Sequence, residues 1–342
     1  MDKNVRLDFQ KTIASSQATL PVVGSIALLL WVLIPNRQPA LSFLEADYGL
    51  WSHVPSFLFK GYWGVGLSAF FAALAVYLMA ELNNSNVLLR VSSRMLGSML
   101  AFLLAFALVC HSLQPGSVVM LLSLLSFFPL FAIYQLPHPG FTFISYLFIS
   151  VASLLFPKML CVVPVYWFIQ GYLRALSFRC FVASLLAVVL PYWFYGGVAL
   201  LTGTLPDFLA HIEALTHYEW GDYTQLPMKD LLTFSFTVLL FLSGSIDFYL
   251  NRFLDKTRTR ILYNVVIMHG VYVILFISLQ PQYFVTLLPL LLIDTAITFG
   301  HFFTLTHTRF SHIYNLILLI LALAIMALSF MPSSWIHSIS FS

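Results

Sequence analysis

Long apolar segments follow one another along almost the whole chain, and basic residues fall mainly in alternate gaps between them. Hydrophobic residues make up 60% of the 342 residues, whereas charged residues make up only 8%. A membrane-spanning helix needs about 20 apolar residues, and only helices or closed barrels satisfy their backbone groups in lipid. The apolar runs are continuous rather than alternating. We therefore predict an all-α, polytopic transmembrane helix bundle.

The segmentation predicts about eleven spanning helices in a single integral membrane domain that covers residues 1–342. The fifth and sixth helices are short and meet at Pro157 and Lys158. An alternative is therefore a re-entrant hairpin over residues 141–173, which leaves nine crossings. Either number places the two termini on opposite sides of the membrane. The predicted helices are 18–35, 61–82, 95–112, 118–136, 141–156, 159–173, 179–202, 230–250, 261–280, 282–303 and 312–331.

The distribution of Lys and Arg predicts the orientation. Four of them, Arg37, Lys60, Lys158 and Lys229, lie in the gaps on one side, and the other twelve of the 16 lie on the opposite side. Because cytoplasmic loops are enriched in Lys and Arg, we expect the N-terminus in the cytoplasm and the C-terminus outside. The basic residues are spread over helix ends, which predicts contacts with membrane lipids and no nucleic-acid partner.

Two longer connections are predicted on the outer side, residues 36–60 and 203–229. The first carries Glu45 and Asp47 among aromatic residues that suit the membrane interface. A carboxylate can deprotonate an acceptor hydroxyl, and a pair can hold a divalent cation against a phosphate. Glu45 and Asp47 are therefore candidate catalytic or metal-binding acids, and the alternative is a solvated loop. The second connection offers acid–base groups for substrate contacts: His211, Glu213, His217, Glu219 and Asp222.

The Glu45-Ala-Asp47 motif in the first outer loop resembles the acidic motif of the GT-C-class membrane glycosyltransferases, which use lipid-phosphate-linked sugar donors. The helix number and the late outer loop resemble O-antigen polymerases and ligases. These resemblances imply a glycosyltransferase or glycan polymerase of the bacterial inner membrane, acting on a polyprenyl-linked donor at the outer face. Arg37 or Lys158 would contact phosphate. The chain departs from both groups, because residues 114–117 lack a further acid and the late loop lacks arginine.

A second candidate site lies within the membrane. His269 and Asp294 are both roughly 12 Å from the predicted cytoplasmic ends of their helices, at about 1.5 Å per residue. A carboxylate at that depth costs several kcal/mol unless it is paired or hydrated, so we expect Asp294 to have a partner. Thr298 and His301 follow on the same helical face. The pattern is typical of a proton or ion relay in a transporter or flippase, and the alternative is a structural pair joining two helices.

A third functional class is a non-catalytic membrane subunit that binds partners through the basic loop 251–260. The three classes depend on different residues. An enzyme needs the outer carboxylates, and a transporter needs the pair within the membrane. A subunit of this kind tolerates changes at both places.

Overall fold

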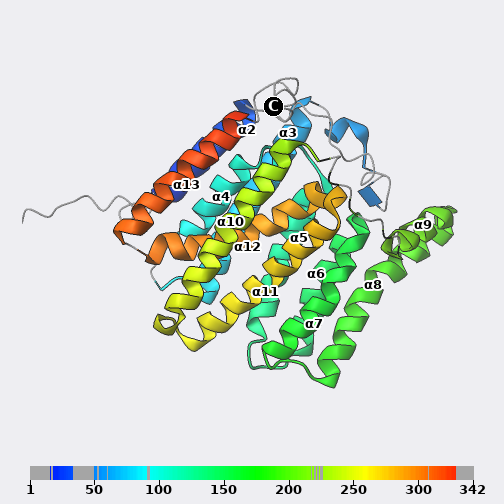
Figure 1. The fold of residues 1–342 in the computed structure, drawn as a ribbon. Helices are drawn as coiled ribbons and strands as arrows, with labels where there is room; N and C mark the ends of the chain where they lie inside the picture. Colours follow the sequence, from blue (N-terminus) through cyan, green and yellow to red (C-terminus); the bar gives the residue numbers. More distant parts are fainter. Residues whose placement is uncertain are drawn as a thin grey trace, which may run out of the picture.

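The computed structural model describes residues 16, 18–33, 50–51, 54–59, 61–90, 93–216, 218, 221, 223, 226–306 and 308–328. Over these ranges the chain forms α-helices and short 3₁₀ turns without any β-strand (Figure 1), which confirms the all-α prediction. Seven helices are long and apolar enough to cross a membrane. The protein therefore has the features of an integral membrane protein.

Each of the eleven predicted segments forms a helix, although four of the helices are shorter than predicted. The long helices are α3 (Gly61–Asn86), α5 (Pro115–Ala132), α8 (Phe178–Thr202), α10 (Met228–Asn251), α11 (Thr257–Leu279), α12 (Phe284–Leu305) and α13 (Arg309–Leu328). The shorter ones are α2 (Thr19–Leu33), α4 (Met95–Phe106), α6 (Pro139–Leu155) and α7 (Val162–Tyr172). The 3₁₀ turns η3 (Leu108–His111) and η4 (Pro157–Cys161) follow α4 and α6, because the chain tightens there instead of continuing as an α-helix.

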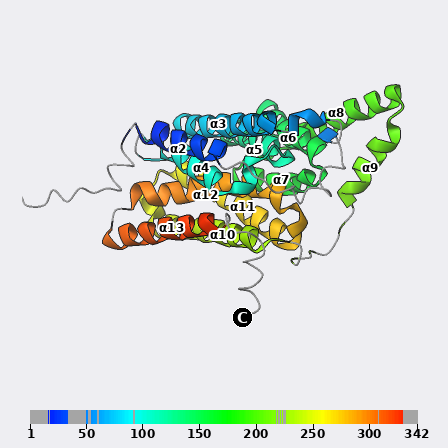
Figure 2. The same cartoon turned by 90° about the horizontal axis from the view of Figure 1, so that it is seen from above.

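Helix α12 lies in the middle of the bundle. It packs against α4 and α5 on one side and against α10 and α11 on the other (Figures 1 and 2). All its residues from 284 to 302 are buried. Small residues allow this close packing, since a Cβ added at Gly244 of α10 would lie 2.5 Å from the carbonyl carbon of Thr298.

The edge of the bundle is apolar and exposed. On α8, Trp193 is 76% exposed and Leu201 is 88% exposed, as expected for side chains that face lipid rather than water. Gly203 then adopts a left-handed conformation (φ 75°) and ends α8.

The prediction of a loop over 203–229 is wrong for part of that segment, because α9 (Leu205–Thr216) is a helix. His211 and Ala214 are buried, whereas Leu209 is 57% exposed, so α9 has one packed face and one open face. It contacts α8 and η4, and it lies at the far edge of the bundle (Figures 1 and 2). An apolar-run search misses such a short amphipathic helix.

Candidate functional site: a buried histidine–aspartate pair

One side chain from α11 and one from α12 meet in the centre of the bundle. His269 Nδ1 lies 2.8 Å from Asp294 Oδ2, and the two side chains are 1% and 0% exposed. The structure thus brings together the two residues that the sequence singled out within the membrane, and Asp294 has a polar partner. We call these two residues the core pair.

A glycine beside His269 permits the contact. A Cβ added at Gly270 would lie 2.4 Å from the Phe241 ring and 3.1 Å from Asp294 Cβ. Without a side chain at Gly270, α11 approaches α10 and α12 closely enough for the imidazole to reach the carboxylate.

Aromatic side chains surround the core pair. The ring of Phe127, from α5, meets the His269 ring edge-on at 5.2 Å, and the ring of Tyr166, from α7, lies 6.2 Å away. Tyr166 Oη is 2.7 Å from Ser126 Oγ, so its hydroxyl is hydrogen-bonded to α5. In such a low-dielectric environment the attraction between His269 and Asp294 is strong, and so is the cost of any unbalanced charge.

Each member of the core pair keeps one polar atom without a hydrogen-bond partner among the described residues. These atoms are His269 Nε2 and Asp294 Oδ1. A carboxylate at Nδ1 favours the tautomer in which Nδ1 carries the hydrogen, and this leaves the Nε2 lone pair able to accept a proton. The core pair can therefore bind and release a proton in a place from which bulk water is excluded.

The other polar residues on this face of α12 have different partners. Thr298 Oγ1 donates to the backbone carbonyl of Asp294 (2.9 Å), and His301 Nε2 lies 3.2 Å from Asp255 Oδ2. Asp255 also accepts a hydrogen bond from Arg90. Sequence reasoning missed this contact, because Arg90 was interpreted only as an orientation signal and Asp255, in another loop, was given no role. The one sequence signal for this contact was the position of an acidic residue, Asp255, within the basic loop 251–260.

Two predicted outer residues attach α9 to the bundle. Lys158, which is 5% exposed, donates from Nζ to the carbonyl of Leu215 (3.3 Å) in the last turn of α9, where a cation is favourable. His211 is fully buried, with Nε2 3.3 Å from Tyr192 Oη, which in turn lies 2.9 Å from Ser153 Oγ. Burial lowers the pKa of His211 to about 4. To bind a phosphate, Lys158 would have to leave the Leu215 carbonyl.

The remaining predicted residues are dispersed or not described. Glu213 is exposed on α9. Within the described ranges, no group of three or more His, Cys, Asp or Glu side chains is placed to hold a metal ion. The catalytic and metal-binding roles of the first outer loop stay predictions. Six residues lie outside the described ranges: Arg37, Glu45, Asp47, His217, Glu219 and Asp222.

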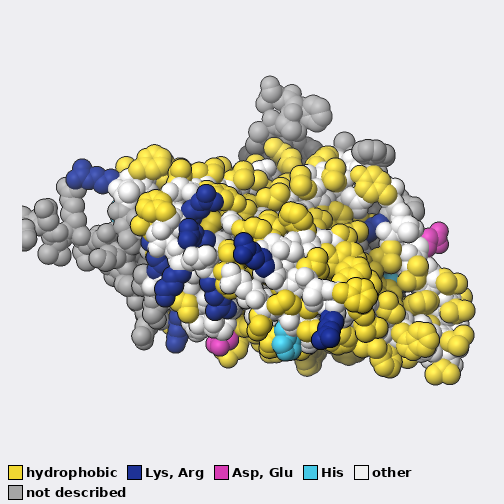
Figure 3. All heavy atoms as spheres, turned by 90° about the horizontal axis from the view of Figure 1, so that it is seen from below, with side chains coloured by type: hydrophobic (Ala, Val, Ile, Leu, Met, Phe, Trp, Pro, Cys, Tyr) yellow, Lys and Arg dark blue, Asp and Glu magenta, His cyan; other side chains and the backbone are white. Residues whose placement is uncertain are grey.

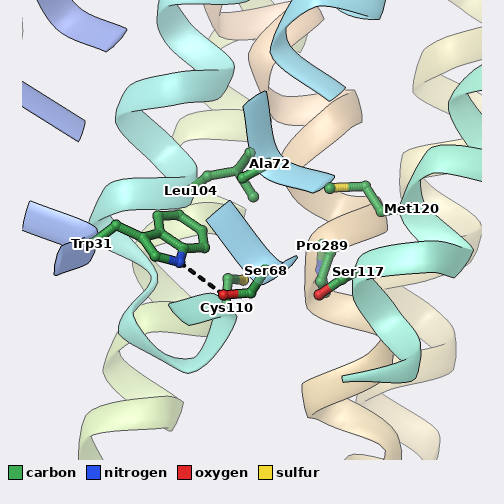
Figure 4. A pocket seen from close by; sticks show the side chains of 8 residues that line it. All are labelled: Trp31, Ser68, Ala72, Leu104, Cys110, Ser117, Met120 and Pro289. Atoms are coloured by element: carbon green, nitrogen blue, oxygen red, sulfur yellow. Dashed lines mark hydrogen bonds between the residues drawn. The ribbon is translucent and has the colours of Figure 1, made fainter. Parts of the chain in front are cut away.

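A small cavity lies near the ends of α2, α3 and α4 (Figure 4). Trp31 Nε1 donates to Ser68 Oγ (2.9 Å), and Ser68 Oγ lies 2.9 Å from the carbonyl oxygen of His111, on whose ring Trp31 stacks at 4.2 Å. Two of these helices, α2 and α3, are joined by the connection that carries Glu45 and Asp47. The lining residues are Trp31, Ser68, Ala72, Leu104, Cys110, Ser117, Met120 and Pro289.

Comparison with known proteins adds no relative from which a role could be transferred. No protein-family model matches the chain, and no curated protein matches it. The functional argument therefore depends on the geometry of this protein alone.

Proposed function

We propose a polytopic membrane protein with eleven crossings, its N-terminus in the cytoplasm and its C-terminus outside. Contacts between helix ends support this alternation. At one end of the bundle Arg90 pairs with Asp255, and Gln135 N donates to the Leu173 carbonyl (3.0 Å). At the other end Lys158 contacts α9. Each of these three contacts joins two connections that the sequence predicts on the same side of the membrane.

The described basic residues support the orientation. Figure 3 shows Lys and Arg side chains gathered on the lower face. Cytoplasmic enrichment in Lys and Arg would make the end that carries them the cytoplasmic one. Lys158 and Lys229 are the two described basic residues at the opposite helix ends. Nine lie in the connections predicted as cytoplasmic: Arg90, Arg94, Arg174, Arg179, Arg252, Lys256, Arg258, Arg260 and Arg309.

We propose that the protein is a proton-coupled transporter or flippase. The observation that carries this proposal is the core pair, a fully buried carboxylate and imidazole that each keep one polar atom unpartnered within the described residues. A merely structural pair would be expected to satisfy these atoms.

Protonation changes the charge of the core pair. With Asp294 ionised and His269 neutral the pair carries one negative charge, and after one proton binds it carries none. Burying a net charge in an apolar core costs several kcal/mol, so the two protonation states favour different surroundings. A free-energy difference of that size is enough to shift a conformational equilibrium almost completely. Proton movement would be coupled to substrate movement in this way.

The test is complementation of a deletion strain of the source organism with the Asp294→Asn variant, at a membrane level equal to that of the wild type. We expect loss of function, because the amide keeps the shape and a hydrogen bond but cannot exchange a proton. The matched control is Asp207→Asn, which neutralises an exposed aspartate in the first turn of α9 and should complement fully. Full complementation by Asp294→Asn would rule out the proton-coupled mechanism.

A second measurement addresses the proton directly. Infrared difference spectra of the purified protein between about pH 5 and pH 8, where histidine titrates, should contain a signal from the core pair. We expect the wild type and Asp207→Asn to give that signal and Asp294→Asn to lose it. Identical spectra from all three proteins would contradict proton binding at the core pair.

The second candidate function is a glycan transferase or polymerase at the outer face of the bacterial inner membrane, acting on a polyprenyl-linked donor. It is favoured by the cavity at the ends of α2 and α3, the helices joined by the connection that carries Glu45 and Asp47. The same strain distinguishes the two functions. Loss of a surface glycan with Glu45→Gln plus Asp47→Asn, together with full complementation by Asp294→Asn, would establish the enzyme and reject the transporter.

A further inference from the structure

A second buried histidine–carboxylate contact lies at the end of α12. Asp255, in the connection between α10 and α11, has a side chain that is 0% exposed. One of its oxygens accepts from Arg90 Nε, and the other lies 3.2 Å from Nε2 of His301, whose side chain is 1% exposed. We call Arg90, Asp255 and His301 the Asp255 cluster. It joins the α3–α4 connection, the α10–α11 connection and the central helix.

Besides Asp255, the neighbours of His301 include aromatic and charged side chains from α10 and α11. Tyr263 of α11 lies 4.7 Å away ring to ring, and Phe248 of α10 lies 5.8 Å away. Asp247 of α10 is close enough to interact electrostatically with both His301 and Arg90. On the side of α4 the contact is apolar, since a Cβ added at the neighbouring Gly300 would lie 2.6 Å from the Leu96 side chain.

The charges around His301 do not balance while its ring is neutral. Two carboxylates, Asp247 and Asp255, face one guanidinium, that of Arg90. Asp255 Oδ2 favours the hydrogen on Nε2, and Nδ1 has no hydrogen-bond partner in the described part of the chain. A proton that binds at Nδ1 makes the ring cationic, so that two positive groups, Arg90 and His301, then face the two carboxylates. It also strengthens the contact with Asp255 by adding a second positive charge against the same carboxylate.

His301, the member of the Asp255 cluster on α12, lies between Asp294 and the C-terminal end of that helix. His301 is seven residues after Asp294 on α12, about two helical turns or 10 Å. Thr298 lies between them, is 0% exposed, and is hydrogen-bonded to the Asp294 carbonyl. Asp255 holds both Arg90 and His301, and it therefore ties the two connections to this part of α12.

We propose that the Asp255 cluster is a proton-dependent latch that closes the cytoplasmic approach to the core pair. The role of the latch rests on the proposed function, because it controls which side of the membrane exchanges protons with Asp294. Protonation of His301 tightens the latch, and loss of that proton or of either partner of Asp255 loosens it.

The experiment measures how fast a thiol placed between the Asp255 cluster and the core pair is modified. Thr298→Cys is introduced after replacement of the native cysteines, Cys110, Cys161 and Cys180. A membrane-impermeant maleimide is then applied from the cytoplasmic side. We expect slow labelling in this parent, and labelling about tenfold faster when Asp255→Asn or Arg90→Gln is added, since each removes one charge-assisted contact. Equal labelling in the parent and in both variants would overturn the latch.

Two controls separate opening from unfolding. Asp230→Asn neutralises a buried aspartate at the opposite end of α10 and should leave labelling unchanged. Asp255→Glu keeps the charge and should stay close to the parent rate. If both controls label as fast as Asp255→Asn, the effect is loss of structure and the latch is rejected.

A pH series tests the histidine without disturbing the aspartate. Labelling of the parent, normalised to the denatured protein, should slow as the pH falls from about 8 to about 5, and His301→Gln should remove this dependence. A flat profile in the parent would reject proton control. Because labelling needs no transport, it can succeed while Asp294→Asn complements fully, which would retain the latch and reject the transporter. Equal labelling in all variants together with loss of function in Asp294→Asn would reject the latch and retain the transporter.

Discussion

The core pair and the Asp255 cluster use the same two residue types, but only the cluster has a third member, an arginine. In both, an imidazole nitrogen lies near a carboxylate, at 2.8 Å in the core pair and 3.2 Å in the cluster. Asp255 has Arg90 as a second partner, and Arg90 is 31% exposed. Asp294 has no cation other than His269 among the described residues.

The difference determines which group responds to protons. Burial acts to raise the pKa of Asp255, but the hydrogen bonds from His301 and Arg90 outweigh it and hold the pKa below its ordinary value of 3.8. Asp255 therefore stays ionised above pH 3.8. In the core pair no permanent charge balances Asp294, because its partner is an imidazole. A nearby arginine thus keeps the Asp255 carboxylate ionised, whereas Asp294 has only an imidazole beside it.

The largest expected effect comes from breaking the core pair. His269→Leu leaves the Asp294 carboxylate buried without a partner, which should lower the free energy of unfolding by about 3–5 kcal/mol. Replacing both residues by leucine should recover most of that loss, because no charge is then buried. Denaturant unfolding in detergent micelles measures both. A single variant as stable as the wild type would show that water or another group satisfies Asp294.

A smaller loss of stability should follow from separating α10 and α12 at Thr298, between the core pair and the Asp255 cluster. Gly244→Ala places a Cβ 2.5 Å from the Thr298 backbone, so the helices must move apart, at a cost of about 1–3 kcal/mol in unfolding free energy. Gly24→Ala is the matched control, because no atom lies within 4 Å of its added Cβ. It should be neutral or stabilise α2 by up to about 1 kcal/mol. Similar losses in both variants would contradict the close packing.

Removing the arginine should cost less than breaking the core pair. Arg90→Gln should lower the unfolding free energy by about 1 kcal/mol, because Arg90 is partly exposed and its attraction to Asp255 is screened. The difference from the wild type should be complete above pH 3.8 and should shrink below it, as Asp255 becomes protonated in the folded protein. Unfolding at several pH values measures this. A difference that grows on acidification would contradict the ion pair.

The smallest effect on the stability of the whole protein should come from protonation of His211. This buried histidine has no carboxylate among its described contacts. Its pKa is lowered from 6.5 to about 4, so its contribution to the docking of α9 is complete above pH 6.5 and is lost progressively toward pH 4. Hydrogen exchange of residues 205–216 should therefore speed up over that range while the rest of the bundle changes little. His211→Phe should remove the pH dependence. If it persists, another group controls α9.

The sequence alone predicted the helical bundle and both residues of the core pair. Continuous apolar runs allow only buried or lipid-facing helices, so all eleven segments were found. A carboxylate inside such a run must be compensated, which identified Asp294 as a residue needing a partner before any contact was known. His269 was identified for the same reason, as a polar side chain at a similar depth on the adjacent helix.

Only the tertiary structure decided how the loops meet. Arg90 and Asp255 are 165 positions apart, and each is an ordinary charged residue in its own connection. Their contact with His301 exists because α12 is central and its end lies beneath both connections. Helix α9 was missed for a related reason, since its buried face depends on Lys158 and Tyr192, which belong to other helices. Membrane insertion depends on the composition of each segment, whereas a polar contact depends on distances that arise only when the helices pack.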